Sequence, residues 1–368
     1  MNRNELKILH ISKDLVGGIG TVIITLNSFF KNFKIICYDD FQVVNPIIKY
    51  KLFKNELIDS LNDVEILHFH GAWTPHLVPL TNKFKLPTVV SPHGALDKVS
   101  LEKSKFKKLI VKYSYLKKAY SNASCIHALT VKEAHDIRDY GIKNVPIFII
   151  PNGIDTDVNL EIDNEQQNVW LKKADGKRII LSLSRLHTAK GIDILIDAFS
   201  ELHKNIETNV LFIVGSGDVA YVQHLKRRIE TLGLQNSIFL LGELVGVMKN
   251  TVYDVADIFV LPSYNEGFGI TVLEAYRQNV PVITTTATPF SDIKKLNCGW
   301  YINPNTQEIL TALKEATSLS KNDLLQKGRA GNEWIKKNYS LDITMKLYAN
   351  MYRWLLGESD TPEFIYKG

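Results

Sequence analysis

Short apolar runs alternate with longer amphipathic stretches along the whole chain. In its first part, runs rich in β-branched and aromatic residues predict strands at 7–11, 34–38, 64–68, 88–91, 125–128 and 147–150. Similar runs follow at 178–182, 210–214, 238–241, 257–261 and 280–283. Strands that alternate with helical stretches in this way are typical of parallel α/β layers.

A polar stretch from Asn152 to Lys177 interrupts the series and is interpreted as a linker or domain edge. A chain of 368 residues exceeds one typical core, so two domains are expected. We predict two Rossmann-like domains, at 1–163 and 164–340, that face each other across a cleft. The tail, 341–368, is predicted to begin with a helix whose apolar side carries Ile343, Leu347, Met351 and Trp354.

Composition changes this picture little. The hydrophobic fraction is 45% and the charged fraction 23%, which is typical of a folded globular protein. The three cysteines lie far apart and show no zinc spacing, which favours reduced thiols. Because we find no apolar signal core at the N-terminus and no apolar stretch of about 18 residues, we expect a cytoplasmic protein.

The sharpest candidate chemistry lies where a predicted strand gives way to a helix. Two carboxylates, Glu266 and Glu274, flank Gly267 and Gly269 there. Backbone N–H groups at a helix start favour an anion, and Glu274 shares a helix face with Ile270, so its side chain can reach back over the first turn. Carboxylates beside a phosphate make sense only if they accept hydrogen bonds from sugar hydroxyls while cations neutralise the phosphates. A nucleotide sugar supplies both kinds of group.

Other loops that follow predicted strands are further candidates, because ligands of open parallel sheets sit beyond the carboxyl ends of the strands. Arg185 and Lys190 follow the seventh strand and could supply the cations that the glutamates require. Loops that would let the backbone approach a phosphate follow the first and eighth strands, with Gly18, Gly20, Gly215 and Gly217.

Taken in order, these loops, together with Pro92-His93-Gly94 and Pro151-Asn152-Gly153, resemble glycosyltransferase family 4, whose members are retaining enzymes of the GT-B fold. The resemblance runs from about Leu6 to about Tyr352. The segments 91–96, 126–130 and 288–292 are similar to the branch that builds bacterial surface polysaccharides.

The resemblance implies that a hexose-type sugar moves from a UDP- or GDP-sugar to a growing glycan or lipid-linked acceptor of O-antigen, capsule or lipopolysaccharide. Arg185 and Lys190 would contact the donor diphosphate, and His93 and Glu266 would lie near the transferred sugar. Glu274 would hold the ribose hydroxyls, and the tail helix would cross back to the first domain. The other residues assigned to the donor are Gly18, Gly20, Gly215, Gly217, Gly267, Phe268, Gly269 and Ile270.

No metal or cofactor is expected. At the donor, Arg185 and Lys190 take the part of a cation, and no Asp-x-Asp pair accompanies them. Elsewhere in the chain, the pair His68 and His70 could suggest a metal site, but the two side chains are assigned to opposite strand faces and no third ligand is evident. His70 is assigned to the acceptor side instead.

The segment from Leu101 to Tyr120 contains seven lysines against one acid. One interpretation is a core-packed helix with a solvated basic rim. The other is a helix that docks on an anionic membrane surface where a lipid-linked acceptor is found, which would place the enzyme at the inner face of the cytoplasmic membrane.

Other functions fit the same fold. A nucleotide-sugar epimerase would act without an acceptor. A dinucleotide-dependent oxidoreductase could use the first glycine loop, but Gly17 to Gly20 lack the full Gly-x-Gly-x-x-Gly spacing. No nucleic acid partner is expected, because only Leu101 to Tyr120 offers an extended basic stretch.

Overall fold

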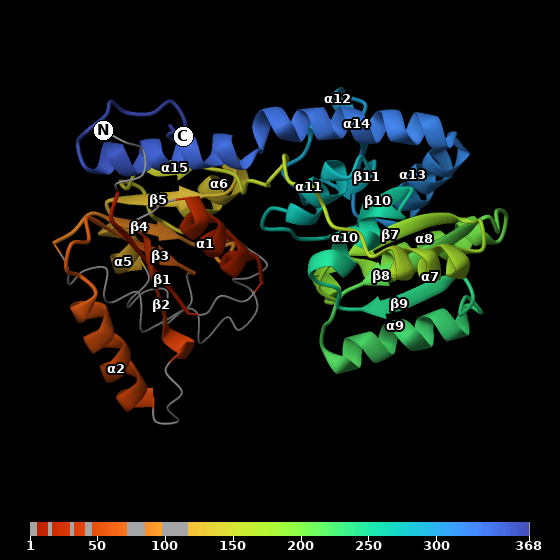
Figure 1. Ribbon diagram of the computed structural model, residues 1–368, viewed down its shortest axis with the longest axis horizontal. Helices are drawn as coiled ribbons and strands as arrows, with labels where there is room; N and C mark the ends of the chain where they lie inside the picture. Colours follow the sequence, from red (N-terminus) through yellow and green to blue (C-terminus); the bar gives the residue numbers. More distant parts are fainter. Residues whose placement is uncertain are drawn as a thin grey trace. The chain divides into compact units, whose positions relative to one another are not determined.

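The chain folds into two compact units. The computed structural model describes residues 6–13, 17–29, 33–40, 46–71, 85–97 and 117–367. Unit 1 comprises Met1–Gly153 and Asp342–Gly368, and unit 2 comprises Ile154–Leu341 (Figure 1). The division precedes the boundary of 163 expected from sequence, because the backbone of Ile154 is hydrogen-bonded to that of Tyr339 and Leu341. Each unit holds one parallel six-stranded sheet, which confirms the predicted α/β class.

The sheet of unit 1 has the strand order β2-β1-β3-β4-β5-β6, with every neighbouring pair parallel. Its strands are β1 (Ile8–Ser12), β2 (Phe33–Cys37), β3 (Ile66–His70), β4 (Thr88–Ser91), β5 (Cys125–Ala128) and β6 (Ile147–Ile149). Its described helices are α1 (Gly17–Phe29), η1 (Tyr38–Asp40), α2 (Pro46–Asp59), α5 (Lys117–Ser121), α6 (Val131–Asp139) and α15 (Leu341–Leu355).

The inner strands of unit 1 carry different side chains on their two faces. Leu9, Leu67 and Phe69 belong to a hydrophobic cluster. The alternate positions in β1 and β3 carry histidines, and these are buried as well. Burial of polar side chains is favourable only when they have hydrogen-bond partners, so the histidine face requires a polar network.

Helix α15 of the C-terminal segment packs on unit 1 and supplies part of that network. Its buried residues include Met345, Tyr348 and Tyr352, whereas Ile343 and Leu347 of the predicted apolar stripe are only half-buried. The helix was therefore predicted correctly, and its predicted stripe is buried in part, because Met351 is fully buried and Trp354 packs against Phe148. After α15, the tail pairs with β6 through an antiparallel bridge at Phe148 and Ile365.

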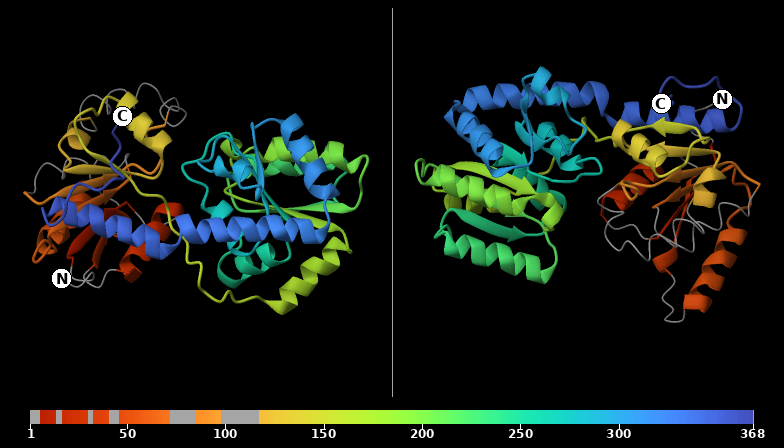
Figure 2. Two further views of the ribbon diagram at one scale, coloured as in Figure 1. Left: turned by 90° about the horizontal axis from the view of Figure 1, so that it is seen from above. Right: turned by 180° about the vertical axis from the view of Figure 1, so that it is seen from behind.

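The sheet of unit 2 has the order β12-β11-β10-β7-β8-β9, again with parallel neighbours. Figure 2 shows helices on both faces of this sheet. Its strands are β7 (Arg178–Leu183), β8 (Asn209–Val214), β9 (Ile238–Gly242), β10 (Ile258–Leu261), β11 (Val282–Thr285) and β12 (Gly299–Ile302). The edge strand β12 has no counterpart in the sequence prediction.

On one face of the unit 2 sheet, a hydrophobic cluster joins the strands to α8, α9 and α13 through residues such as Ile196, Ile229 and Leu313. The helices of this unit are α7 (Asn164–Ala174), η4 (Thr188–Lys190), α8 (Ile192–His203), α9 (Val219–Thr231), α10 (Gly246–Asp254), α11 (Ile270–Arg277), α12 (Asp292–Lys295), α13 (Thr306–Ser318) and α14 (Lys321–Asn338).

The stretch interpreted as a linker, Asn152 to Lys177, contains helix α7. Asp163 caps this helix by accepting the Gln166 N–H, and Trp170 is buried. The linker interpretation was wrong for this part, because one large buried side chain anchors an otherwise polar helix. No helix among the described residues has the length and apolar character needed to cross a bilayer.

Candidate active site

The strand order of unit 2 reverses between β7 and β10, because β8 and β9 follow on one side and β11 and β12 on the other. In open α/β sheets ligands bind at such a reversal, beyond the carboxyl ends of the strands. The loops that follow β7 and β10 touch there. The N–H groups of Tyr264 and Asn265 both donate to the carbonyl oxygen of Ala189, at 2.9 and 3.3 Å. This contact joins the two loops that hold Arg185, Lys190, Glu266 and Gly267.

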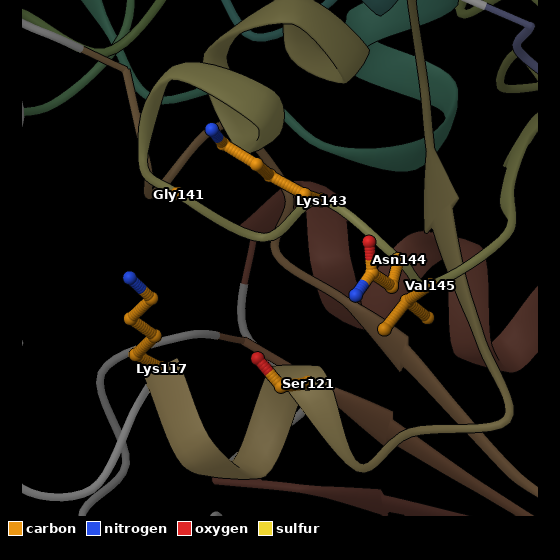
Figure 3. A pocket seen from close by; sticks show the side chains of 6 residues that line it. All are labelled: Lys117, Ser121, Gly141, Lys143, Asn144 and Val145. Carbon is orange, nitrogen blue, oxygen red and sulfur yellow. The ribbon is translucent and has the colours of Figure 1, made fainter.

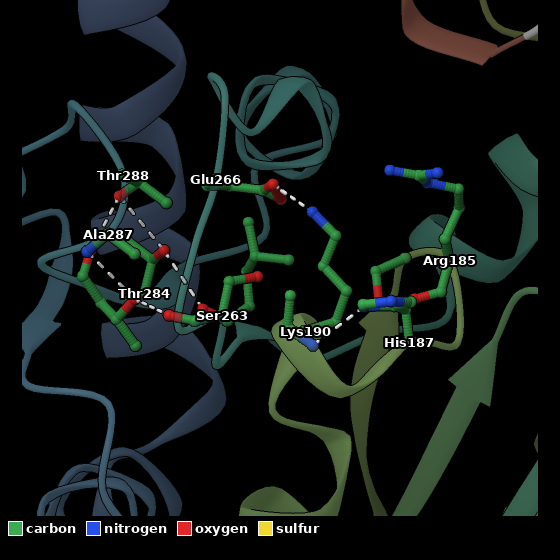
Figure 4. Close-up of polar contacts among 12 residues, drawn as sticks. Arg185, His187, Lys190, Ser263, Glu266, Thr284, Ala287 and Thr288 are labelled. Carbon is green, nitrogen blue, oxygen red and sulfur yellow. Dashed lines mark hydrogen bonds and ion pairs between the residues drawn. The ribbon is translucent and has the colours of Figure 1, made fainter. Parts of the chain in front are cut away.

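Lys190 and Glu266 form an ion pair across these two loops (Figure 4). Their side chains are 13% and 10% exposed, so the pair is more strongly coupled than an exposed surface pair. Gly191 follows Lys190 with a φ of 64°, and a Cβ there would lie 2.3 Å from the carbonyl oxygen of Pro262. The glycine therefore allows the Lys190 turn to lie directly against the end of β10.

Arg185 lies in the same loop but is exposed. Figure 4 shows that its guanidinium and the Lys190 ammonium extend in the same direction from this loop. Between them, His187 caps η4 by accepting the Ala189 N–H on Nδ1 at 3.0 Å. The loop therefore places one half-buried and one exposed cation at the strand reversal.

Glu274 is held by two partners that the sequence analysis did not identify. Its Oε1 accepts a hydrogen bond from Lys249 Nζ of α10 at 2.5 Å, and its Oε2 accepts one from Tyr253 Oη at 3.1 Å. Burial, and the neighbouring Glu274 carboxylate, raise the pKa of Tyr253 well above its usual value, so its hydroxyl remains a donor. Each carboxylate oxygen keeps a second lone pair with which it can accept a ligand hydroxyl.

The segment between the two glutamates combines an open helix start with a buried anchor. Gly269 has a φ of 92° and precedes α11, where it offers no side-chain cap. The first N–H groups of α11, which begins at Ile270, are therefore not satisfied by a cap and favour an anion. Gly267 is exposed, but the Phe268 ring is buried against Phe290. The Phe268 side chain anchors the loop in an aromatic cluster, and the assignment of this residue to donor binding stays a prediction.

Gly215 and Gly217 permit a close contact between the loops after β7 and β8. A Cβ at Gly215 would lie 1.9 Å from the Ser184 carbonyl oxygen, and one at Gly217 would lie 1.9 Å from that of Leu186. The Leu186 N–H also donates to the carbonyl oxygen of Ser216 at 2.8 Å. This packing alone explains why both positions need glycine, and the assignment of Gly215 and Gly217 to donor binding stays a prediction.

In unit 1, Gly18 and Gly20 lie in the first turns of α1, which begins at Gly17. They were expected in a loop that approaches a phosphate, whereas the structure places them inside a helix. The strand order of unit 1 also reverses beside them, between β1 and β3. The start of α1 therefore lies at the ligand-binding edge of its sheet.

The same edge of unit 1 holds a cluster of histidines. His68 and His70 are two residues apart in one strand and stack with ring centroids 4.1 Å apart. Their assignment to opposite strand faces was wrong, because β3 extends to His70 and residues i and i+2 share a face. His10, His93 and His127 complete the cluster and were missed as partners of this pair.

Burial keeps these imidazoles neutral. Desolvation, with a smaller contribution from neighbouring histidines, lowers the pKa values of His10, His68 and His70 far below the usual range. For the same reasons the pKa of His93 falls to about 3 and, by burial, that of His127 to about 4. The ligand atoms of His10, His68 and His70 lie within 4.8 Å of one another, which makes them the metal-ligand candidates among the described residues.

A separate pocket of about 490 Å³ lies between α5 and the loop that precedes β6 (Figure 3). None of the predicted site residues lines it. Its polar lining comes from two lysines, a serine and an asparagine, and the lining residues are Lys117, Ser121, Gly141, Lys143, Asn144 and Val145. The basic segment Leu101 to Tyr120 reaches this pocket only with Lys117, because 98–116 lie outside the described residues.

Two family models match the chain. The model described as Glycosyltransferase Family 4 matches residues 43–158, and the model described as Glycosyl transferases group 1 matches 163–331. The chain belongs to glycosyltransferase family 4. Within this glycosyltransferase, the first match includes His70 and His93, and the second includes every candidate from Arg185 to Glu274.

Curated relatives match parts of this glycosyltransferase. Mannosylfructose-phosphate synthase of Agrobacterium fabrum is 33% identical over 40% of this chain and 34% of its own. An uncharacterized glycosyltransferase of Methanocaldococcus jannaschii, MJ1607, is 29% identical over 68% of this chain and 65% of its own. The lipopolysaccharide core mannosyltransferase LpcC of Rhizobium leguminosarum is 24% identical over 58% and 62%. The chain thus spans between one third and two thirds of these relatives.

Solved structures support the fold. A glycosyltransferase from Rickettsia africae superposes with a TM-score of 0.75 at 20% identity, covering 97% of this chain and 100% of that one. Anabaena HepE, solved in complex with UDP and glucose, superposes with a TM-score of 0.77 at 14% identity, covering 95% and 100%. Glycosyltransferases of the GT-B fold are thus its structural neighbours, and the expected fold is confirmed.

Proposed function

We propose that this glycosyltransferase moves a hexose-type sugar, with retention of configuration, from a UDP- or GDP-sugar to a growing glycan of a bacterial surface polysaccharide. The ion pair of Lys190 and Glu266 at the strand reversal, beside the start of α11, carries the proposal. It puts a cation for the diphosphate next to a carboxylate for sugar hydroxyls. Glu274 lies one helix turn beyond, where it would accept the ribose hydroxyls.

In the proposed reaction, the bond between the sugar C1 and the diphosphate oxygen breaks, and the electron pair stays on the diphosphate. An acceptor oxygen bonds to C1 on the same face, and its proton passes to the departing phosphate oxygen. Lys190 and Arg185 stabilise the charge that grows on the diphosphate, and His93 lies near the sugar. Lys190 exchanges Glu266 for the diphosphate as the donor arrives, so Glu266 becomes available to the transferred sugar.

Replacing Lys190 tests this role. Loss of one preorganised charge at the leaving group lowers kcat by roughly 10²- to 10³-fold, so we expect Lys190→Ala to abolish most turnover of a labelled nucleotide sugar. Lys226→Ala, which removes an exposed lysine of α9, is the matched control. Circular dichroism separates loss of folding from loss of transfer. Transfer at the control rate by folded Lys190→Ala would remove Lys190 from the mechanism.

The products distinguish the alternatives. An anomeric NMR signal of the product identifies retention, whereas conversion of the donor without an acceptor identifies an epimerase. Reduction of a nicotinamide cofactor would identify the oxidoreductase.

We also propose that the reaction needs no metal, so turnover should persist in EDTA. The expectation that the chain has no Asp-x-Asp pair was wrong, because Asp155 and Asp157 form one, in which the Asp155 carboxylate accepts the Asp157 N–H at 3.1 Å.

For the acceptor side, we propose that Leu101 to Tyr120 docks on anionic lipid at the inner face of the cytoplasmic membrane. The lysine content of this segment supports the proposal. Each lysine near such a surface contributes about 1 kcal/mol at low salt. We expect co-sedimentation with vesicles that contain phosphatidylglycerol and its loss at high salt. Equal binding to neutral vesicles would contradict the electrostatic mechanism.

A further inference from the structure

Two hydrogen-bonded chains of side chains run through the histidine cluster of unit 1. In the first, His68 Nδ1 lies 2.8 Å from Tyr352 Oη and its Nε2 lies 2.6 Å from Ser91 Oγ. Ser91 Oγ lies 2.7 Å from His127 Nδ1, and His127 Nε2 lies 2.8 Å from the carbonyl oxygen of Ile150.

Elementary donor and acceptor rules fix the ring protons of this first chain, beside which the Tyr348 hydroxyl lies 3.4 and 3.3 Å from His127 Nδ1 and Nε2. The Ile150 carbonyl only accepts, so His127 carries its proton on Nε2 and presents a bare Nδ1. Ser91 therefore donates to His127 and accepts from His68 Nε2. The bare Nδ1 of His68 then accepts the hydroxyl proton of Tyr352. Both histidines are fixed as the Nε2–H form, so they serve as an internal reference.

The second chain consists of three imidazoles. His10 Nδ1 lies 2.7 Å from His70 Nε2, and His70 Nδ1 lies 2.9 Å from His93 Nε2. A neutral imidazole has one N–H, so His70 donates at one nitrogen and accepts at the other. Only two arrangements satisfy both contacts: all three rings protonated on Nδ1, or all three protonated on Nε2.

We propose that His10 and His70 are positioning residues that share one tautomer with His93 and so set whether its other ring nitrogen, Nδ1, donates to, or accepts from, a sugar hydroxyl. This inference rests on the proposed function only for its ligand. When all rings are protonated on Nε2, His93 presents a bare Nδ1. A shift of one proton along each of the two contacts, with one exchanged at each outer nitrogen, converts the three rings to the Nδ1–H form.

A metal ion explains these distances less well. Two nitrogens bound to one tetrahedral zinc at 2.0–2.1 Å lie about 3.3 Å apart, whereas the His10 and His70 nitrogens lie 2.7 Å apart, the length of a hydrogen bond. His68, the third metal candidate, already uses both nitrogens for Tyr352 and Ser91. A metal would have to break these contacts.

The backbone that carries His93 is fixed independently of its ring. His93 and Gly94 have positive φ values of 53° and 74°. Glu133 holds this turn, because its Oε1 accepts the Gly94 N–H at 2.5 Å and its Oε2 accepts the Leu129 N–H at 2.7 Å. Since the turn is fixed, His93 can respond to His70 by exchanging a proton rather than by moving.

The ¹⁵N shifts of the ring nitrogens test the proposal directly, because protonated and bare nitrogens resonate in separate ranges. In the ligand-free chain near neutral pH, we expect His10, His70 and His93 to show the same tautomer. His68 and His127 should show Nε2–H in every sample. Different tautomers within the three rings would overturn the proposal. So would stoichiometric zinc in the purified protein whose removal shifts the His10 and His70 signals.

Two variants separate positioning from structure. His70→Asn keeps an amide near the Nδ1 position, beside His93, whereas His70→Gln keeps one near the Nε2 position, beside His10. We expect both to uncouple the tautomers of His10 and His93. Loss of the His93 contact in His70→Gln should lower kcat about tenfold at unchanged KM, and His70→Asn should restore part of it. His224→Gln, on the exposed face of α9, is the control.

The outcomes distinguish this inference from the proposed function. Matching tautomers without any sugar transfer would leave the coupling intact and reject the function. Sugar transfer with unequal tautomers, or with equal kcat in both His70 variants and the wild type, would reject the coupling and leave the function intact. If a His70 variant does not fold, the tautomers measured in the wild type still decide whether the three rings are coupled.

Discussion

The buried carboxyl of Glu133 predicts a pH-dependent stability for unit 1. Desolvation raises its pKa from 4.5 to about 7, although the N–H groups of Gly94 and Leu129 act in the opposite direction. Of the charged neighbours, Asp136 raises this pKa and Lys132 lowers it. Compared with the unfolded chain, the folded unit therefore favours the protonated form of the Glu133 carboxyl.

The magnitude follows from linkage. Because the folded pKa lies above the unfolded one, the stability from this group is complete below pH 4.5 and is lost as the pH rises through about 7. At 1.36 kcal/mol for each pKa unit, the loss is about 3 kcal/mol. Glu133→Gln removes this pH dependence. At low pH this substitution lowers the free energy of unfolding of unit 1 by about 1–3 kcal/mol, because the amide NH₂ group of the glutamine faces one of the two backbone donors.

Hydrogen exchange measures this effect unit by unit. The Ile126 N–H of β5 reports on unit 1, and the Leu211 N–H of β8 reports on unit 2 as an internal control. Between about pH 5 and about pH 8, the opening free energy of β5 in the wild type, relative to Glu133→Gln, should fall by about 3 kcal/mol. The β8 value should not differ between the two proteins. A difference at β5 that does not change with pH would refute the reasoning.

Three further predictions concern other contacts. Gly217→Ala forces a Cβ against the Leu186 carbonyl oxygen and should destabilise unit 2 by about 1–3 kcal/mol in urea unfolding; an unchanged midpoint would show that the two loops separate easily. Tyr352→Phe leaves His68 Nδ1 without its donor. It should lower the opening free energy of unit 1, measured by hydrogen exchange, by about 1–3 kcal/mol and leave that of β8 unchanged. Glu274→Gln should weaken nucleotide-sugar binding about tenfold by calorimetry, and unchanged affinity would exclude its ribose contact.

Most of the strands could be predicted because parallel strands buried on both faces form continuous apolar runs. Strand β12 (Gly299–Ile302) lies at the sheet edge, and although Trp300, Tyr301 and Ile302 form a short apolar run, the sequence analysis did not assign them to a strand. The error at His70 arose from the period of a strand, because His68 and His70 are two residues apart and such residues share a face rather than lie on opposite faces. Strand β3 includes both residues and therefore aligns their rings.

Part of the candidate site could be predicted from the strands that precede its residues. Lys190 and Glu266 each follow a strand, and both strands lie at the reversal of the sheet, so sheet topology brings them together. The partners Lys249 and Tyr253 lie inside helix α10, and no local sequence pattern marks them as partners of Glu274. His10 was missed because a histidine among apolar strand residues shows its partner only after the sheet has formed.

The discontinuity of unit 1 has a consequence for biosynthesis. Unit 2 is one uninterrupted stretch of chain, whereas the tyrosines that cover the histidine face of unit 1 belong to α15, which follows unit 2 in the sequence. Unit 2 can therefore reach its native state during synthesis while the N-terminal segment of unit 1 still lacks α15. A nascent chain stalled before α15 should expose those imidazoles to solvent and to chaperones.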